Sequence, residues 1–352
     1  MNPTIKDVAK KANVSIATVS RVLNHLPGYS DRTKAKVYKA IEEIGYQPNA
    51  IARGLINKKT HTIGVMFPTV SSLFSSEILR GVEDLAQNNG YSVMVCNTDS
   101  DGKRTLKYLQ VLREKQVDGL IFSSEVLKEE YYQTLQQMQI PYVLVSTECR
   151  YDNVPYIKVD DFQAAYDAVE YLIGFGHRKI ALLSGTKHDT IAGLPRIEGY
   201  KKALEHHGIP VNDAYIVYGD FLFEVGYNAM EELLAKAPDI TAIFAASDEM
   251  AIAAISVAAK HGIKVPDELS IIGYDDLKLA RMSVPPLTTV RQPLYDMGNL
   301  ACQKLIRMIT TEEPESSVIM DHFIIERQTV RPLGPNPPDR LPFFRRTLAD
   351  RI

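Results

Sequence analysis

The chain has 352 residues, of which 45% are apolar and 24% are charged, the composition of an ordinary globular protein with two or three domains. Its longest apolar stretch is far shorter than the roughly 20 residues that span a membrane, its N-terminus lacks an apolar signal-peptide core, and its three cysteines are too scattered for a disulfide framework or a thiolate zinc site. The net charge of −3 conceals an asymmetry, because residues 1–60 hold 11 Lys and Arg against 4 Asp and Glu. A basic head on an acidic body is expected when the head alone meets a polyanion. From the scattered cysteines and the charged N-terminus we expect the protein in the cytoplasm. The alternative is a solvated basic surface.

Three short helical patterns occupy residues 1–46. Thr4 and Asp7 form a capping-box signature for the first helix, and Ser15 and Ser30 are hydroxyl caps for the second and third. Apolar residues follow each cap at helical spacing. Two short helices joined by about three residues predict a helix-turn-helix, whose second helix enters the major groove of DNA.

The outward positions of this second helix are the candidate DNA contacts. Arg21 is the residue that can pair bidentately with guanine, which is worth about 1–3 kcal/mol of discrimination. Ile16 and Ala17 can contact thymine methyl groups, and a solvated surface arginine is the alternative for Arg21. Thr4, Ser15, Thr18 and Ser20 are suited to phosphate contacts, and Asn24 is the remaining outward position.

The next segment, residues 49–60, is predicted to be a hinge. Pro48 ends the head, and the weak helical pattern of residues 50–56 contains Gly54, which lowers its intrinsic helicity. Such a segment is marginal as an isolated helix.

From residue 62 onward, apolar runs alternate with amphipathic helices. Near-continuous apolar strands separated by helices predict parallel sheets covered on both faces. The order is βαβα on either side of about residue 160, so we expect an α/β body with two doubly wound lobes and a ligand cleft between them, beyond the carboxyl ends of the strands. The predicted strands are residues 63–67, 91–96, 119–122, 141–145, 179–183, 241–246 and 269–273, and the predicted helices include 77–88, 162–175 and 193–206.

These patterns divide the chain into four parts. We expect a helix-turn-helix domain at 1–48, a hinge helix at 49–60, a two-lobed effector-binding and dimerisation domain at 61–334, and a proline-rich tail at 335–352.

Residues 4–24, TIKDVAKKANVSIATVSRVLN, resemble the head of the lactose/galactose repressor family, and residues 45–55, GYQPNAIARGL, resemble its hinge. The body is similar too, in VDGLI (117–121), GHRKI (176–180), SDEMA (247–251), IGYDD (272–276) and LTTV (287–290). The resemblance extends to about residue 332. Within the family, the sequence most resembles the catabolite-control and maltose-repressor branches.

The resemblance implies a homodimer that binds a pseudo-palindromic operator. The two hinge helices then form on the operator, and Leu55 matches the leucine that is pushed into the minor groove, where an apolar wedge bends the duplex. Packing of Leu55 in a core is the alternative. The other hinge residues expected at the DNA are Asn49, Ala52 and Arg53.

The resemblance also implies a small sugar-type effector in the cleft. Arg196 and Asp275 match the family's effector contacts, and a charge at the end of an apolar strand, such as Asp275, is costly without a ligand or partner. An ion pair joining the lobes is the alternative for both. Cleft-lining positions are matched by Phe74, Ser146, Phe221 and Asp248, of which the two phenylalanines could instead belong to the core.

A further implied partner is a serine-phosphorylated phosphocarrier protein acting as a corepressor. Tyr295, Asp296 and Arg307 match the surface that binds it in the catabolite-control branch, but Gln303 stands where an arginine is expected. Since a phosphoserine prefers a bidentate guanidinium, we favour a repressor of carbohydrate-utilisation genes that answers directly to a sugar over a global catabolite regulator.

Two other classes of protein are disfavoured. The sequence has no HExxH, GxSxG, P-loop or GxGxxG motif, and His206 and His207 are adjacent rather than one helical turn apart, so we expect no enzyme, cofactor or metal site. A periplasmic sugar-binding protein would share the two-lobed body, but the basic helix-turn-helix argues against it.

Overall fold

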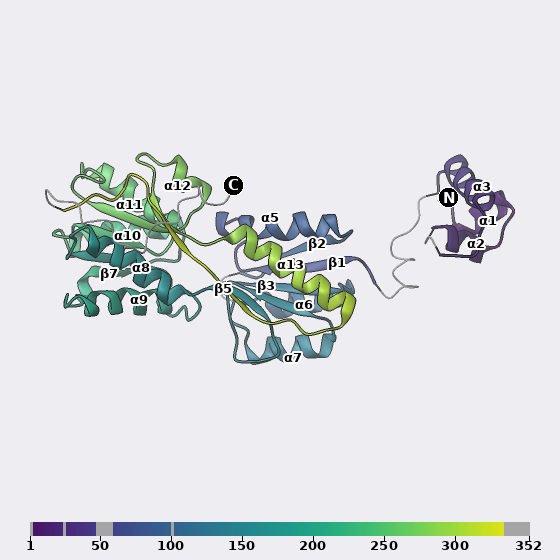
Figure 1. The fold of residues 1–352 in the computed structure, drawn as a ribbon, viewed down its shortest axis with the longest axis horizontal. Coiled ribbons are helices and arrows are strands. Elements are labelled where there is room, and N and C mark those ends of the chain that lie inside the picture. The colour runs from purple at the N-terminus through teal and green to yellow at the C-terminus, as the bar shows by residue number, and fades with distance from the viewer. Residues whose placement is uncertain (1–2, 24–25, 47–58, 100–101, 334–352) are drawn as a thin grey trace. The chain divides into compact units, whose positions relative to one another are not determined.

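The computed structural model describes residues 3–23, 26–46, 59–99 and 102–333, and the chain divides into two compact units, Met1–His61 and Thr62–Ile352. The first unit contains α1 (Ile5–Ala12), α2 (Ile16–Leu23) and α3 (Asp31–Ile44) (Figure 1). Asn13, in the left-handed backbone region, ends α1. Valines from all three helices are fully buried together, so the predicted helix-turn-helix is confirmed.

The second unit holds two sheets with helices on both faces, which confirms the predicted α/β body (Figure 1). The first sheet has the order β11-β5-β4-β3-β1-β2, and every pair of neighbours is parallel. Its strands are β1 (Thr62–Phe67), β2 (Ser92–Asn97), β3 (Gly119–Ser123), β4 (Tyr142–Val145), β5 (Tyr156–Val159) and β11 (Val318–Met320).

Alternate residues of these strands face two separate cores. Ile63 and Val65 pack with α5 (Leu73–Asn88) and α13 (Leu294–Thr311), whereas Met66 packs with α6 (Thr105–Glu114) and α7 (Glu129–Met138). Both faces of the sheet are therefore covered, as the continuous apolar runs predict.

The second sheet has the order β12-β10-β9-β8-β6-β7, and only the edge strand β12 is antiparallel. Its strands are β6 (Ile180–Ser184), β7 (Ile216–Tyr218), β8 (Ala242–Ala245), β9 (Ser270–Asp275), β10 (Thr288–Arg291) and β12 (Phe323–Ile325). The helices α8 (Asp161–Gly174) and α9 (Gly193–His206) cover one face, and α10 (Phe223–Lys236) and α11 (Asp248–Lys260) cover the other. The turn η1 (Asp213–Tyr215) precedes β7, and α12 (Lys278–Met282) follows β9.

The division of the body near residue 160 is incomplete as a description of its lobes. The chain leaves the first lobe after β5, but it returns to form α13 and β11 before it reaches β12 of the second lobe (Figure 1). Short strands such as β11 and β12 have no long apolar run, so their places depend on the sheet edges that they meet.

The contact between α5 and α13 requires a glycine at position 81. A Cβ built on Gly81 would lie 2.0 Å from the Tyr295 carbonyl oxygen, which is backbone of α13 and cannot rotate away. We expect Gly81→Ala to lower the free energy of unfolding by about 1–3 kcal/mol through overpacking. Chemical denaturation followed by circular dichroism measures this, with the exposed Gln87→Ala on the same helix as the control. Equal stability of the two variants would contradict the assigned α5–α13 contact.

Candidate functional site

The outward face of α2 carries side chains that are available to a ligand. Ser15 caps the helix, since its Oγ accepts a hydrogen bond from the Thr18 backbone N–H at 3.1 Å and lies 2.8 Å from the Thr18 hydroxyl. Val19 and Val22 point into the head core. Of the predicted DNA contacts on this helix, Ile16, Ala17 and Arg21 are exposed and Thr18 and Ser20 are half-buried.

Thr4 lies at the start of α1, where its backbone N–H and hydroxyl both donate to the Asp7 carboxylate, at 2.8 and 2.7 Å. These hydrogen bonds lower the pKa of Asp7. The predicted pairing of Thr4 with Asp7 is therefore present. The remaining predicted DNA contacts, Asn24, Asn49, Ala52, Arg53 and Leu55, lie outside the described residues, as do the hinge up to residue 58 and the tail 335–352.

A cleft of about 440 Å³ lies where strands of both sheets end. Its lining comes from the segments that follow β1, β3 and β4 in one lobe and β6, β7, β8, β9 and β10 in the other. This is the position expected for ligands of doubly wound sheets. Of the predicted effector contacts, Phe74, Ser146, Arg196, Phe221 and Asp275 line the cleft.

Arg196 is the most constrained of these side chains. Its Nε and Nη2 donate to Asp161 Oδ1 at 3.0 and 2.8 Å, and its Nη1 donates to the Ala246 carbonyl oxygen. The guanidinium carbon lies 3.7 Å from the centre of the Tyr274 ring. Although burial disfavours the charged form, Tyr274 and Asp161 raise the pKa of Arg196, which therefore stays cationic. The ion pair lies within the second lobe and does not join the two lobes.

Asp275 ends β9 at the wall of the cleft. Gln292 Nε2 donates to its Oδ1 at 2.7 Å, and the side chain is buried. Burial raises the pKa of Asp275 to about 7, against the opposing effect of the nearby Arg196 charge. A hydrogen-bond donor on a ligand would therefore meet a carboxyl group that titrates near neutral pH.

Three predicted contact residues share a strained backbone. Ser146, Phe221 and Asp275 have φ angles of 54°, 72° and 115°, a region that residues with a Cβ seldom adopt. Such strain clusters at ligand sites, where the surrounding structure holds it in place. Ser146 Oγ is also buried without a hydrogen-bond partner among the described residues, so a ligand could supply one.

The prediction that Asp248 lines the cleft is wrong, because this residue is absent from the lining. It is fully buried, and its carboxylate accepts hydrogen bonds from the Thr289 hydroxyl at 2.5 Å and the Leu277 N–H at 2.6 Å. Burial and the neighbouring Asp275 raise its pKa well above the usual range. Asp248 therefore anchors the segment that follows β9, through the backbone of Leu277.

Sequence reasoning missed several polar residues of the cleft. Glu249, next to Asp248, lines the cleft, and burial raises the pKa of its carboxyl against the opposing effect of the Leu73 and Phe223 backbone. Glu125 accepts from the Thr98 and Thr105 hydroxyls at 2.9 and 2.7 Å. A signal for these two residues existed, since Glu125 and Glu249 lie two and four positions after the ends of the buried strands β3 and β8. The other missed residues with charged or amide side chains are Lys128, Lys158, Asp161, His188, Asp189, Asp220 and Gln292.

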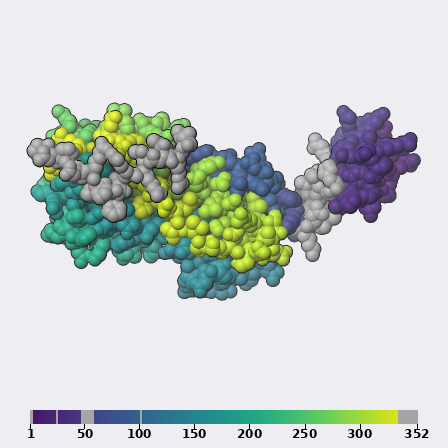
Figure 2. All heavy atoms as spheres, viewed as in Figure 1, coloured from purple at the N-terminus to yellow at the C-terminus, as the bar shows by residue number. Residues whose placement is uncertain are grey.

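The predicted partner surface lies on α13, which is exposed along the first lobe (Figure 2). Asp296, Gln303 and Arg307 are exposed, and Arg307 lies 3.7 Å from a Glu315 carboxylate oxygen. Tyr295 is half-buried and donates to Asp84 at 2.9 Å beneath the Arg80 guanidinium.

Comparison with known proteins finds two family matches. Residues 4–49 match the bacterial regulatory proteins of the lacI family, and residues 60–327 match the periplasmic binding proteins and sugar-binding domain of the LacI family. Catabolite control protein A of Priestia megaterium is 42% identical over 332 residues, which cover 94% of this chain and all of that protein. The repressor CytR of Escherichia coli is 37% identical, over 94% of this chain and 97% of that protein.

Solved structures agree with these matches. The lac repressor dimer bound to operator and an anti-inducer matches with a TM-score of 0.84 at 27% identity. The match covers 94% of this chain and all of the lac repressor chain. The complex of the regulator CelR with cellobiose matches with a TM-score of 0.71 at 31% identity. The match covers 93% of this chain and all of the CelR chain. Within the described residues, no helix is long and apolar enough to cross a bilayer.

Proposed function

The chain belongs to the LacI family of bacterial regulatory proteins, and from this premise we propose that it is a dimeric transcription repressor of carbohydrate-utilisation genes whose operator affinity is controlled by a sugar. One observation carries the proposal. A cleft at the strand ends brings the Arg196 guanidinium and the Asp275 carboxyl together with Phe74 and Phe221, in a chain that also has a helix-turn-helix head.

These side chains suit the chemistry of a sugar. Its hydroxyls both donate and accept hydrogen bonds, so they can pair with a carboxylate, a guanidinium and the Ser146 hydroxyl, while the apolar ring face lies against an aromatic ring. The cleft volume of about 440 Å³ is that of a small-molecule site. Because the CelR structure is a complex with cellobiose, both mono- and disaccharides belong among the ligands to be tested.

The head and the hinge supply the DNA half of the proposal. Two copies of α2 would enter two half-sites of a pseudo-palindromic operator, with the hydroxyl side chains on phosphates. Asn49, Ala52, Arg53 and Leu55 of the two hinges would contact the minor groove between the half-sites. Such a role places the protein in the cytoplasm, where operator DNA is found.

Arg21→Ala tests the direct reading of bases by α2. We expect operator affinity to fall by about 1–3 kcal/mol because a bidentate pair with guanine is lost, and non-specific binding to fall much less. Titration of both duplexes at one salt concentration measures this. Lys39→Ala, which removes a head charge from α3, is the control. Equal losses on the two duplexes would show that Arg21 contributes charge alone.

The whole proposal is tested by titrating the protein against a pseudo-palindromic duplex with a central CG step, in the presence of a panel of mono- and disaccharides. A sugar that shifts operator affinity about tenfold, or roughly 1.4 kcal/mol of coupling, supports it, and the sign of the shift separates inducer from corepressor. No operator binding, or no response to any sugar, contradicts it.

The 42% identity to catabolite control protein A favours a second candidate, a global carbon catabolite regulator. Its DNA binding would be promoted by a serine-phosphorylated phosphocarrier protein on the α13 surface of Tyr295, Asp296 and Arg307. The exposed Gln303 offers no guanidinium there, and Arg307 is close to Glu315. The same titration with that phosphoprotein decides between the candidates, since only the global regulator gains operator affinity from it.

A further inference from the structure

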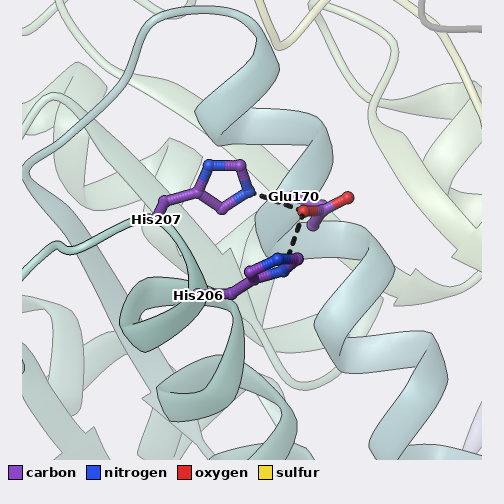
Figure 3. A group of neighbouring side chains, drawn as sticks. All are labelled: Glu170, His206 and His207. Carbon is purple, nitrogen blue, oxygen red and sulfur yellow. Dashed lines mark hydrogen bonds and ion pairs between the residues drawn. The ribbon is translucent and has the colours of Figure 1, made fainter.

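A cluster of two imidazoles and a carboxylate lies on α8 and α9, where these helices end away from the cleft. Glu170 comes from α8, His206 is the last residue of α9, and His207 follows it (Figure 3). Each offers one ligand atom, and the three atoms lie within 4.8 Å of one another. Two adjacent histidines on one helix are poorly spaced to bind a metal by themselves. Here the Glu170 carboxylate, from a second helix, adds a third ligand beside them.

We propose that Glu170, His206 and His207 bind one Zn²⁺ ion per chain, with water as the fourth ligand. Zinc bonds to imidazole nitrogen and carboxylate oxygen are about 2.0–2.2 Å long, so tetrahedral ligand atoms lie about 3.4 Å apart. Glu170 Oε1 lies 2.6 Å from His207 Nε2 and 3.9 Å from His206 Nδ1, on either side of that value. Small side-chain rotations therefore convert the cluster into a zinc site.

Donor chemistry selects the class of ion. Two imidazoles favour zinc and its neighbours in the first transition row, whereas Mg²⁺ and Ca²⁺ prefer sites made of oxygen atoms. The His207–Glu170 hydrogen bond shows what the ion must replace, because the Nε2 proton that His207 donates has to leave that nitrogen when the metal binds. The Tyr166 hydroxyl hydrogen-bonds to His206 Nδ1 and must turn away from that nitrogen as well. It can remain as an outer partner of Glu170, since it lies 3.2 Å from Glu170 Oε1.

The cluster is open to solvent and its helices are fixed. The side chains of His206, His207 and Glu170 are 66%, 35% and 33% exposed, so an ion can reach them. A Cβ on Gly199 would lie 2.2 Å from the Phe162 carbonyl oxygen, so α8 and α9 pack backbone to backbone. The ion would link two elements that are already in place.

The same two helices carry the cleft ion pair at their other ends. Asp161 is the first residue of α8 and Arg196 lies in the first turn of α9. Glu170 follows Asp161 by nine positions along α8, a rise of about 14 Å. Zinc would therefore clamp the helix pair that presents Asp161 and Arg196 to the cleft, and would stabilise the second lobe.

Calorimetric titration of the full-length, tag-free protein with ZnCl₂ in excess Mg²⁺ tests the proposal. We expect one saturable ion per chain, a higher melting temperature with zinc, and loss of both in Glu170→Gln and His207→Gln. His261→Gln is the matched control, because His261 pairs with Glu231 at 2.7 Å beside a lysine and without a second histidine. Anomalous diffraction from a zinc-soaked crystal locates the ion.

Two results would overturn the proposal. One is the absence of saturable zinc binding below millimolar concentration in the unaltered protein. The other is zinc binding that persists unchanged in both variants, which would place the ion elsewhere. All three side chains are exposed to solvent by a third or more, so their replacement leaves the fold intact, and melting curves without zinc verify this.

Discussion

Replacement of Arg196 by methionine is expected to lower the free energy of unfolding of the body by about 3–5 kcal/mol. The variant keeps an unbranched apolar stem but removes the guanidinium, and so leaves the Asp161 carboxylate buried without the two hydrogen bonds that this group donates. The cation–π interaction of the guanidinium with the Tyr274 ring is lost as well. Urea denaturation followed by circular dichroism measures the loss, because the chain has no tryptophan to report on it.

Two further variants separate the buried charge from simple packing. Lys202→Met on the same helix removes an exposed partner of Glu205 and should change stability by less than about 0.5 kcal/mol. Arg196→Met combined with Asp161→Asn removes the stranded charge and should recover part of the stability. If the double variant is no more stable than Arg196→Met alone, the loss of the guanidinium partner of the Asp161 carboxylate is not the cause.

The second large effect is expected at Asp275, where effector affinity should fall about tenfold between pH 8 and pH 6. Burial raises the pKa of this carboxyl to about 7, so raising the pH through 7 ionises it. A sugar hydroxyl donates to the ionised form, and the affinity therefore follows the ionised fraction. Isothermal titration with the sugar identified in the operator assay, repeated across this pH range, provides the measurement.

Asp275→Asn identifies the group responsible. The amide keeps the shape of the side chain but does not titrate, so we expect the response of operator binding to the sugar to be lost while operator binding without the sugar is retained. Asp213→Asn, an exposed change outside the cleft, should keep both the response and its pH dependence. A normal response in Asp275→Asn would refute the assignment of Asp275 as an effector contact.

Local sequence was sufficient for the elements that have a strong local signal. Caps such as Ser15 and Ser30 begin helices where predicted, because a side-chain oxygen satisfies N–H groups that the helix leaves unpaired. Long apolar runs such as residues 63–67 became central strands, because burial on both faces leaves no polar position. The short strands β5, β7, β10, β11 and β12 were not predicted, since three or four residues carry little periodic signal.

The candidate effector site was predictable only in outline. Parallel strands place their carboxyl ends at one edge, so residues that follow them, such as Ser146 and Asp275, were expected in the cleft, and they line it. Asp248 also follows a strand, but its carboxylate turns to Thr289 and Leu277. The direction of one side chain depends on partners about 30 or 40 residues away, and strand order does not contain that information.

The sequence by itself determined the head, the alternation of strands and helices, and the family, because each depends on neighbours a few residues apart. Only the tertiary structure decided that α13 and β11 return to the first lobe, that Arg196 pairs with Asp161, and that Glu170 meets His206 and His207. These contacts join residues 35 or more positions apart. Only the packing of the chain brings such residues together, so no local periodicity, cap or spacing predicts these contacts.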